Sequence, residues 1–244
     1  DLGANGDLNA NTETHVAWCW KESATAGFDM VAYTGNGSAR TISHSLSAVP
    51  KFIMVKNRES TENWRLYHNG IDNTHEIYID LSNAKVDTDT AWNDTTPTSS
   101  VFSVGTNHGV NKDTEGHIAY LFADVKGFSK FGSYTGNGSS NGVYVHLGFK
   151  PALIIIKRTN GTQWWVLKDS KRSHSNGDNV NKYILYPNDD DAEGTDSNHM
   201  DLLANGFKYR DSAGAGNASG APYIYMAWGE APFVNSKGVP ANAR

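Results

Sequence analysis

The sequence of 244 residues has little of several features that define common classes of protein. It has one cysteine, Cys19, so no disulfide can form within the chain and packing must hold the fold. Its apolar runs, such as 52–55 and 153–156, are about four residues long, whereas a membrane-spanning helix needs about 20. The formal net charge is −5, without the basic surplus of a nucleic-acid-binding protein. We therefore expect no membrane insertion and no nucleic acid as a partner.

Glutamine is also scarce, since Gln163 is the only one beside 24 asparagines and 24 glycines. Asparagine and glycine favour turns and are poor helix formers. No stretch has a sustained hydrophobic stripe with the helical period of 3.6 residues, whereas short β-branched runs recur. The composition predicts an all-β protein with many tight turns.

The segment from His15 to Glu22 alternates like a strand, with Val16, Trp18 and Trp20 on one face. Exposed together, these side chains would form a large apolar patch, so we expect the segment to belong to a sheet. Cys19 lies within it. Because a free cysteine is usually a small buried side chain, we expect Cys19 to be buried rather than nucleophilic.

An internal repeat decides the architecture. The sequence Tyr-Thr-Gly-Asn-Gly-Ser at 33–38 recurs unchanged at 134–139, and a proline leading into an apolar strand and then a lysine follows in both places. Trp64 aligns with Trp164 in this comparison. The repeat predicts a lead-in of residues 1–27, a first copy of 28–127, a second copy of 128–233 and a tail of 234–244. The closing strands 117–124 and 223–230 resemble 15–22, so the lead-in ends an upstream unit or adds a stray strand to a sheet.

Seven or eight short strands in each copy, separated by Asn-Gly and similar turns, predict two tandem β-sandwich units of jelly-roll or concanavalin-like type. The units are separate or share sheets. The glycine-rich stretch 34–37 leads into a strand rather than a helix, so we interpret it as a hairpin turn and not a phosphate-binding loop. We expect both copies to have the same strand order, with Trp64 and Trp164 in equivalent buried sites.

No residue is predicted to be catalytic. Acidic residues recur near the ends of the closing strands, which favours a structural task (Glu13, Glu22, Asp124, Glu230). Asp189, Asp190 and Asp191 with Glu193 form an acidic cluster that could bind Ca²⁺, but they lack the spacing of a known calcium loop and are interpreted as a solvated turn. The nine histidines are scattered, which argues against zinc. We expect no metal and no cofactor.

The seven tryptophans are the strongest sign of binding, because sugar rings stack on exposed indole. Trp92 and Trp165 have no aromatic counterpart in this alignment of the copies. Together with Tyr67 and His68, they are the candidate ligand-binding residues. A packed, partly buried ring is the alternative interpretation for each of them.

The sequence resembles tandem repeats in virion structural proteins of tailed phages, especially marine ones, which are often labelled tail fibre or lectin-like. The shared features are the Tyr-Thr-Gly-Asn-Gly-Ser motif, the proline-led strand ending in Lys-Asn-Arg or Lys-Arg, and the closing strand ending like Ala-Glu-x-Pro-Phe. The resemblance covers residues 14–244. It implies a non-enzymatic structural and adhesive module at the virion surface or outside the cell, with other virion proteins and host cell-surface polysaccharide as partners.

Two alternatives remain open: a glycan-degrading tail enzyme on a lectin-like fold, and a cellular lectin or self-assembling surface filament. A duplicated fold favours the adhesive module, because repetition builds length and multivalent contacts. Few charged residues or prolines protect the expected edge strands. We therefore expect a homo-oligomer, with a trimer as the first expectation and with Trp92 or Trp165 at the subunit contact or at an exposed tip.

Overall fold

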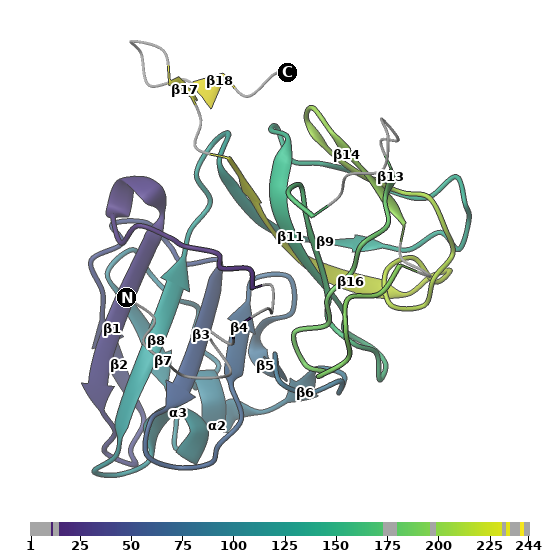
Figure 1. Ribbon diagram of the computed structural model, residues 1–244. Helices are drawn as coiled ribbons and strands as arrows, with labels where there is room; N and C mark the ends of the chain where they lie inside the picture. The colour runs from purple at the N-terminus through teal and green to yellow at the C-terminus, as the bar shows by residue number, and fades with distance from the viewer. Residues whose placement is uncertain are drawn as a thin grey trace.

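The computed structural model describes residues 11, 15–172, 180–195, 199–230, 233–234 and 240–241, and strands dominate them (Figure 1). The strands form several antiparallel sheets, which confirms the prediction of an all-β sandwich fold. Among the described residues, no helix has both the length and the apolar character to cross a membrane.

The first copy holds a six-stranded sheet in the order β1-β8-β3-β4-β5-β6 and a two-stranded sheet of β2 and β7. The turn η1 (Ala24–Ala26) precedes it, and two short helices, α2 (Asp89–Trp92) and α3 (His108–Asn111), flank β7. Its strands are β1 (Phe28–Thr34), β2 (Arg40–Ser43), β3 (Phe52–Asn57), β4 (Arg65–His68), β5 (Asp72–Tyr78), β6 (Val86–Asp87), β7 (Val101–Val104) and β8 (Gly116–Phe122).

The second copy holds two four-stranded sheets, in the orders β12-β11-β16-β9 and β10-β15-β14-β13, and β17 pairs with β18 beyond them. Its strands are β9 (Ser129–Thr135), β10 (Tyr144–His146), β11 (Pro151–Arg158), β12 (Val166–Asp169), β13 (Val180–Asn181), β14 (Met200–Leu203), β15 (Gly206–Tyr209) and β16 (Pro222–Gly229), followed by β17 (Phe233–Val234) and β18 (Pro240–Ala241). Most of the expected tail lies outside the described residues.

The two copies share one strand order. The run β1-β8-β3-β4 in the first copy corresponds to β9-β16-β11-β12 in the second, and β2 beside β7 corresponds to β10 beside β15. Asn69-Gly70 lies in the turn between β4 and β5, and Asn205-Gly206 joins β14 to β15, as expected of hairpin dipeptides. The expectation of a common strand order is therefore confirmed.

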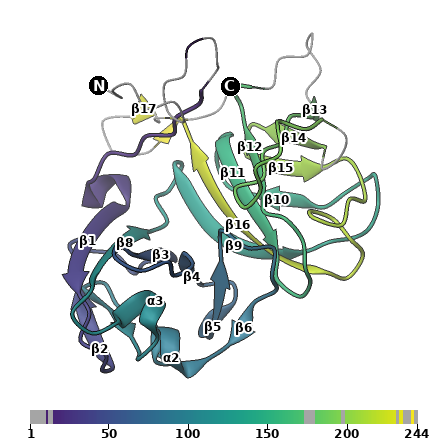
Figure 2. The ribbon, with the colours of Figure 1, turned by 60° about the horizontal axis from the view of Figure 1, so that its bottom comes forward.

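Each copy has its own apolar core. A further cluster of buried apolar residues lies between the six-stranded sheet of the first copy and the β12-β11-β16-β9 sheet of the second. We call this the interface cluster. The copies are thus two separate sandwiches packed against each other, as Figures 1 and 2 show. The interface cluster consists of Phe28, Phe52, Leu66, Ile71, Ile77 and Phe122 from the first copy and Phe131, Leu153, Trp165, Leu167, Ile224, Met226 and Trp228 from the second.

The expectation that 15–22 is a strand is wrong. The segment has no strand assignment, although Trp18 and Trp20 are half-buried against the interface cluster. The six-stranded sheet already has β8, and the β12-β11-β16-β9 sheet already has β16, at the interior position that this sequence pattern fits. The expectation of a buried Cys19 is also wrong. Cys19 is exposed, whereas its two neighbours in the sequence, Trp18 and Trp20, are half-buried.

Candidate functional site

The repeated motif at 33–38 connects β1 to β2, which lie in different sheets, so it is not the expected hairpin turn. The fully buried side chain of Asn111 holds it in place. The Oδ1 atom of Asn111 accepts a hydrogen bond from the Asn36 amide at 3.1 Å, and its Nδ2 atom donates to the Ser38 carbonyl at 2.7 Å. In the second copy, Asn217 makes the same two bonds.

Other residues of the motif have equally structural tasks. The Tyr33 hydroxyl donates to the Val110 carbonyl at 2.6 Å, and Tyr134 donates to Gly216 at 2.7 Å. Gly37 and Gly138 both have a φ of 64°, in the left-handed region that favours glycine. In both copies the motif fixes the connection from one sheet to the other. Its identical sequence in the two copies therefore reflects the fold rather than a ligand.

Two of the four candidate ligand residues lie in the core of the first copy. Trp92 is 1% exposed and Tyr67 is 3% exposed, and their rings meet edge to face at 6.0 Å. Trp92 ends α2, which packs its apolar side into the sandwich. The expectation that these rings are surface candidates is therefore wrong.

The other two candidates lie between the copies, and for them the surface expectation is equally wrong. Trp165 is fully buried in the interface cluster, and its indole N–H donates to the Tyr78 carbonyl at 2.7 Å. His68 is also fully buried, with Nε2 at 3.1 Å from the Tyr225 carbonyl oxygen, and burial lowers its pKa to about 4. Both residues join the two sandwiches.

The strand register corrects the alignment of the tryptophans. Leu66 pairs with Met54 in the first copy as Leu167 pairs with Ile155 in the second, which makes Trp64 equivalent to Trp165. The backbone N–H of each donates to a side chain from the following segment, Trp64 to Asp80 and Trp165 to Asn188. The expected equivalence of Trp64 and Trp164 is therefore wrong by one residue.

This shift matters because the two neighbouring tryptophans just before β12 differ sharply in burial. Trp164 is 47% exposed, whereas Trp64 is half-buried, so the two do not occupy equivalent buried sites. The sequence did contain the necessary signal. The separation of 101 residues that relates Tyr33 to Tyr134 also relates Trp64 to Trp165. That separation leaves Trp164 opposite Asn63, without an aromatic counterpart.

Trp164, which is 47% exposed, forms an aromatic pair with Tyr186, which is half-buried against the core of the second copy. The ring centroids are 5.3 Å apart and the ring planes are tilted by 43°. The turn that follows Tyr186 carries Asp189, Asp190 and Asp191, whose carboxylate oxygens lie within 4.8 Å of one another. Asp190 and Asp191 are exposed and Asp189 is half-buried. Three carboxylates fall short of the six to eight oxygens that Ca²⁺ takes, so they do not by themselves define a cation site. We call Trp164 and Tyr186 the aromatic pair.

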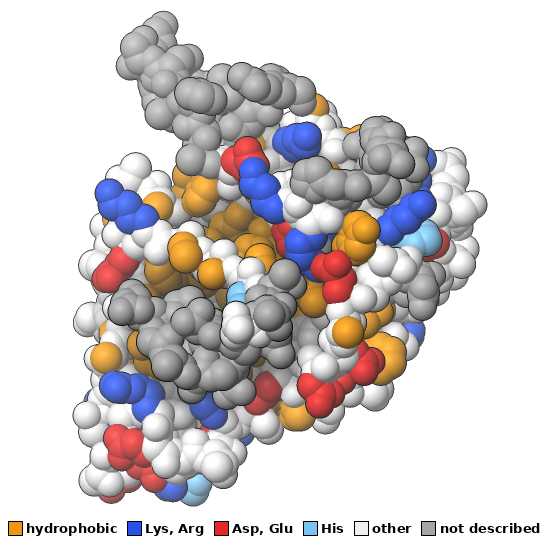
Figure 3. Space-filling model, viewed as in Figure 1, with side chains coloured by type: hydrophobic (Ala, Val, Ile, Leu, Met, Phe, Trp, Pro, Cys, Tyr) orange, Lys and Arg blue, Asp and Glu red, His pale blue; other side chains and the backbone are white. Residues whose placement is uncertain are grey.

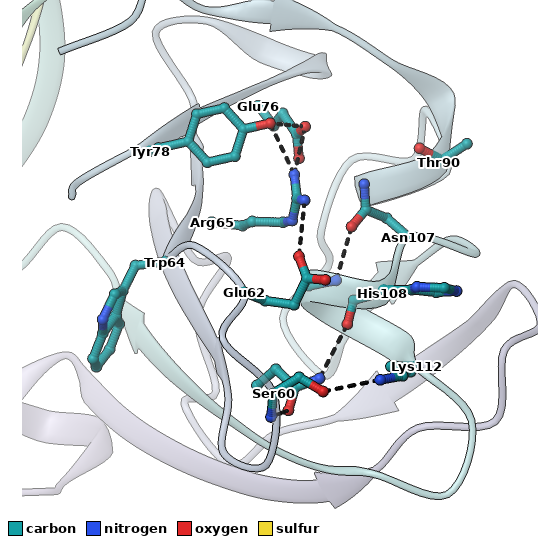
Figure 4. A network of polar contacts seen from close by, with 12 residues as sticks. Ser60, Glu62, Trp64, Arg65, Glu76, Tyr78, Thr90, Asn107, His108 and Lys112 are labelled. Atoms are coloured by element: carbon teal, nitrogen blue, oxygen red, sulfur yellow. Dashed lines mark hydrogen bonds and ion pairs between the residues drawn. The ribbon is translucent and has the colours of Figure 1, made fainter. Parts of the chain in front are cut away.

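The first copy differs from the second in a second place, a buried network around Arg65 (Figure 4). The Arg65 guanidinium donates to a Glu76 oxygen at 2.7 Å and to the Tyr78 hydroxyl at 2.9 Å, and it lies 3.5 Å from a Glu62 oxygen. Arg65 and Glu76 are 8% and 3% exposed. The strand register places Val166 and Ile184 at the equivalent positions of the second copy.

The network continues toward α3 at the surface. Ser60 donates to Glu115 at 2.5 Å and accepts from Lys112 at 2.9 Å, while Asn57 donates to Glu115 at 2.7 Å. Hydrogen bonds from Lys112, Ser60 and Asn57 lower the pKa of Glu115 to about 2. These bonds tie the β3–β4 loop to the segment after α3, so this network stabilises local structure.

The acids near the closing strands do not converge on one site. The Asp124 carboxylate accepts from the Phe131 amide at 2.9 Å, and burial raises its pKa. Glu230 forms an exposed ion pair with Lys171 at 2.5 Å, and Glu22 is exposed. Glu13 lies outside the described residues. The aromatic pair is therefore the surface feature best suited to bind a ligand.

The fold and this surface define a class, an all-β protein of two packed sandwiches in which the second copy carries an exposed tryptophan, Trp164, without an aromatic counterpart in the first. Residues 1–232 match the family described as Domain of unknown function (DUF7483), and the chain belongs to that family. No curated protein and no solved structure matches the chain.

Proposed function

We propose that this protein is a non-enzymatic structural and adhesive module of an extracellular or virion appendage, such as a phage tail fibre. It contacts cell-surface polysaccharide through Trp164 and Tyr186. The observation that carries the proposal is the exposed indole of Trp164, which forms a ring pair at a position that the fold does not require to be aromatic.

An exposed indole gains little from the protein's own packing, but it offers an apolar face to a partner. Sugar rings present apolar C–H faces that stack on such rings, while the tyrosine hydroxyl can bond to sugar hydroxyls. The first copy folds with Asn63 at the position of Trp164, so the shared architecture does not explain the tryptophan. A binding task does explain it.

Adhesion is favoured over hydrolysis by where the carboxylates lie. Glycoside hydrolysis uses two carboxyl groups that flank the scissile bond. The acids that follow Tyr186, Asp189 to Asp191, come from a single short segment, and their oxygens lie within 4.8 Å of one another, so they do not flank a bond from two sides. Glu76 is committed to a buried ion pair with Arg65 in the other copy.

A binding screen tests the proposal. We expect the purified chain to bind immobilised cell-surface polysaccharides, and Trp164→Ala to lose at least about tenfold in affinity, which corresponds to about 1.4 kcal/mol. Tyr144→Ala is the matched control, because Tyr144 is a comparably exposed ring, 43% exposed, in the same copy. Equal loss in both variants, or no loss in either, contradicts the proposal. Release of new reducing ends from a bound polysaccharide would favour the enzymatic alternative.

The proposed module assembles with copies of itself, other virion proteins or both. Trp92 and Trp165 do not serve as subunit contacts, because both are buried within the chain. A stable interface should bury more than about 1,000 Å². Light scattering checks self-assembly, and a mass of 26.6 kDa at micromolar concentration contradicts it.

A further inference from the structure

Three aromatic rings from equivalent positions meet in the interface cluster. Phe122 and Trp228 occupy the same register position of β8 and β16, and Trp20 occupies it in the similar sequence at 15–22. Their centroids are 5.8 Å apart for Trp20 and Phe122, 5.3 Å for Trp20 and Trp228, and 5.4 Å for Phe122 and Trp228. The three interplanar angles are 76°, 63° and 71°.

The three ring centroids therefore lie at the corners of a nearly equilateral triangle. The two complete sandwiches supply two of these three positions, with Phe122 and Trp228. At the third position, the described chain has only the segment that resembles their closing strands.

The two faces of segment 15–22 differ as the faces of β8 do. In β8, Phe122 faces the interface cluster, whereas Ala119 and Leu121 are fully buried in the core of their own sandwich. In the segment, Trp20 likewise packs against the interface cluster, but the residues equivalent to Ala119 and Leu121 are exposed. These are Ala17 and Cys19.

The backbone of the segment lacks the partners that its counterparts have. Strand β8 pairs with β1 on one side and β3 on the other, and β16 pairs with β9 and β11 in the same way. Within the described part of the chain, no backbone hydrogen bond joins residues 15–22 to another segment. Apolar side chains are visible in the hollow between the copies (Figure 3). Met30, opposite Tyr120 at the sheet edge, is 41% exposed.

We infer that residues 15–22 are the central strand of a third sandwich of this repeat, which packs into the groove between the two copies around Trp20, Phe122 and Trp228. The third sandwich supplies two neighbouring strands for the backbone of the segment. It also covers Ala17 and Cys19 as the first copy covers Ala119 and Leu121. Its outer face covers the remaining apolar surface of the groove.

The single cysteine makes this inference testable. In the 244-residue chain, we expect Cys19 to react with a maleimide at nearly the rate of a free thiol. A three-unit chain can be made by placing residues 28–116 before residues 15–244, in place of residues 1–14. The junction from Gly116 to His15 then reproduces the native step from Gly116 to His117. In this longer chain, the reaction rate of Cys19 should fall by at least about 100-fold, because a buried group reacts only through local opening.

The control is the same longer chain with Ile53→Asp in the added copy, since Ile53 is fully buried in the parent sandwich. This charge in the core prevents the added unit from folding, so Cys19 should again react quickly. Unchanged Cys19 reactivity in the longer chain overturns the inference, whether or not the added residues fold. Equal protection of Cys19 in the control also overturns the inference. So does protection of Cys19 that increases with the concentration of the 244-residue chain, because it would show that a second chain covers the segment.

Discussion

The two copies place different chemistry at the same point of one fold. The first copy buries the ion pair of Arg65 and Glu76, and the second places Val166 and Ile184 there. A third position, Gly109 in the first copy and Ala215 in the second, changes together with this pair. A Cβ on Gly109 would lie 2.0 Å from Arg65 Nε, so the first copy needs glycine, whereas the second has Ala215. The buried ion pair is therefore not required by the sandwich, in keeping with the modest net contribution of such pairs.

The comparison separates what the fold requires from what each copy adds. Asn111 and Asn217 make the same bonds in both copies, so they belong to the fold. Trp164 is opposite Asn63 and is exposed, so the shared fold does not require it. Where the copies differ in the core, one set of packed residues replaces another.

The largest expected effect tests the corrected alignment of the tryptophans. Trp165→Ala should lower the free energy of unfolding by about 3–5 kcal/mol, because it empties a fully buried ring site. It also removes the hydrogen bond to Tyr78 between the copies. Trp164→Ala should change the free energy of unfolding by less than about 0.5 kcal/mol. Urea unfolding measures both, and similar effects of the two changes would contradict the alignment.

Glu76→Ala should lower the free energy of unfolding by about 3–5 kcal/mol, because it leaves the Arg65 charge buried without its main partner. The double change Arg65→Val with Glu76→Ile introduces the residues found in the second copy. Relative to the original chain, it should leave the free energy of unfolding unchanged or raise it by about 1–4 kcal/mol. Urea denaturation of the single and double variants measures this. A double variant no more stable than Glu76→Ala would show that the sandwiches do not accept each other's cores.

Gly109→Ala should lower the free energy of unfolding by about 1–3 kcal/mol, because the added methyl group meets the Arg65 side chain. The same change in an Arg65→Val background should cost much less, since Val166 and Ala215 coexist in the second copy. A double-mutant thermal unfolding series measures this coupling. Equal cost in both backgrounds would show that Arg65 does not dictate the glycine.

The smallest effect, taken per pH unit, is the pH dependence of stability that Lys168 confers on the second copy. Lys168 is fully buried where the first copy has Tyr67, and burial lowers its pKa to about 7. The folded chain therefore binds fewer protons than the unfolded chain between about pH 7 and the ordinary lysine pKa near 10.5. Stability should rise with pH across this window by up to about 1.4 kcal/mol per pH unit. Lys168→Met should remove that rise in chemical unfolding curves, and an unchanged slope would contradict the assignment.

Much of the architecture was predictable from the sequence because local patterns determine it. Turn-forming residues, short apolar runs and the repeated motif at 33–38 correctly predict an all-β fold with one strand order in both copies. The alternation in 15–22 predicts that Val16, Trp18 and Trp20 are covered together, which is correct for the two tryptophans but wrong for Val16, which is 44% exposed. It does not show whether strands are available to pair with the segment, so the strand and the burial of Cys19 were wrong.

The candidate site was less predictable because burial depends on contacts between distant residues. Trp92, Tyr67 and His68 are polar or amphipathic enough to suit a surface, but α2, β4 and β16 enclose them. Aligning Trp64 with Trp164 is an error of one residue, and here one residue separates the fully buried Trp165 from the exposed Trp164. The Arg65 network joins side chains of β4 and the neighbouring β5, and no short motif in the sequence marks this pairing.

The measurement that tests the central claim most directly is an NMR titration of the indole N–H signals with a polysaccharide that the chain binds. Seven tryptophans give seven possible reporters, and Trp164→Phe and Trp64→Phe assign the two that matter. The account predicts that the Trp164 signal shifts in proportion to bound ligand, while the signals of Trp64 and the buried Trp165 stay in place. Saturable binding that leaves the Trp164 signal unmoved would contradict it.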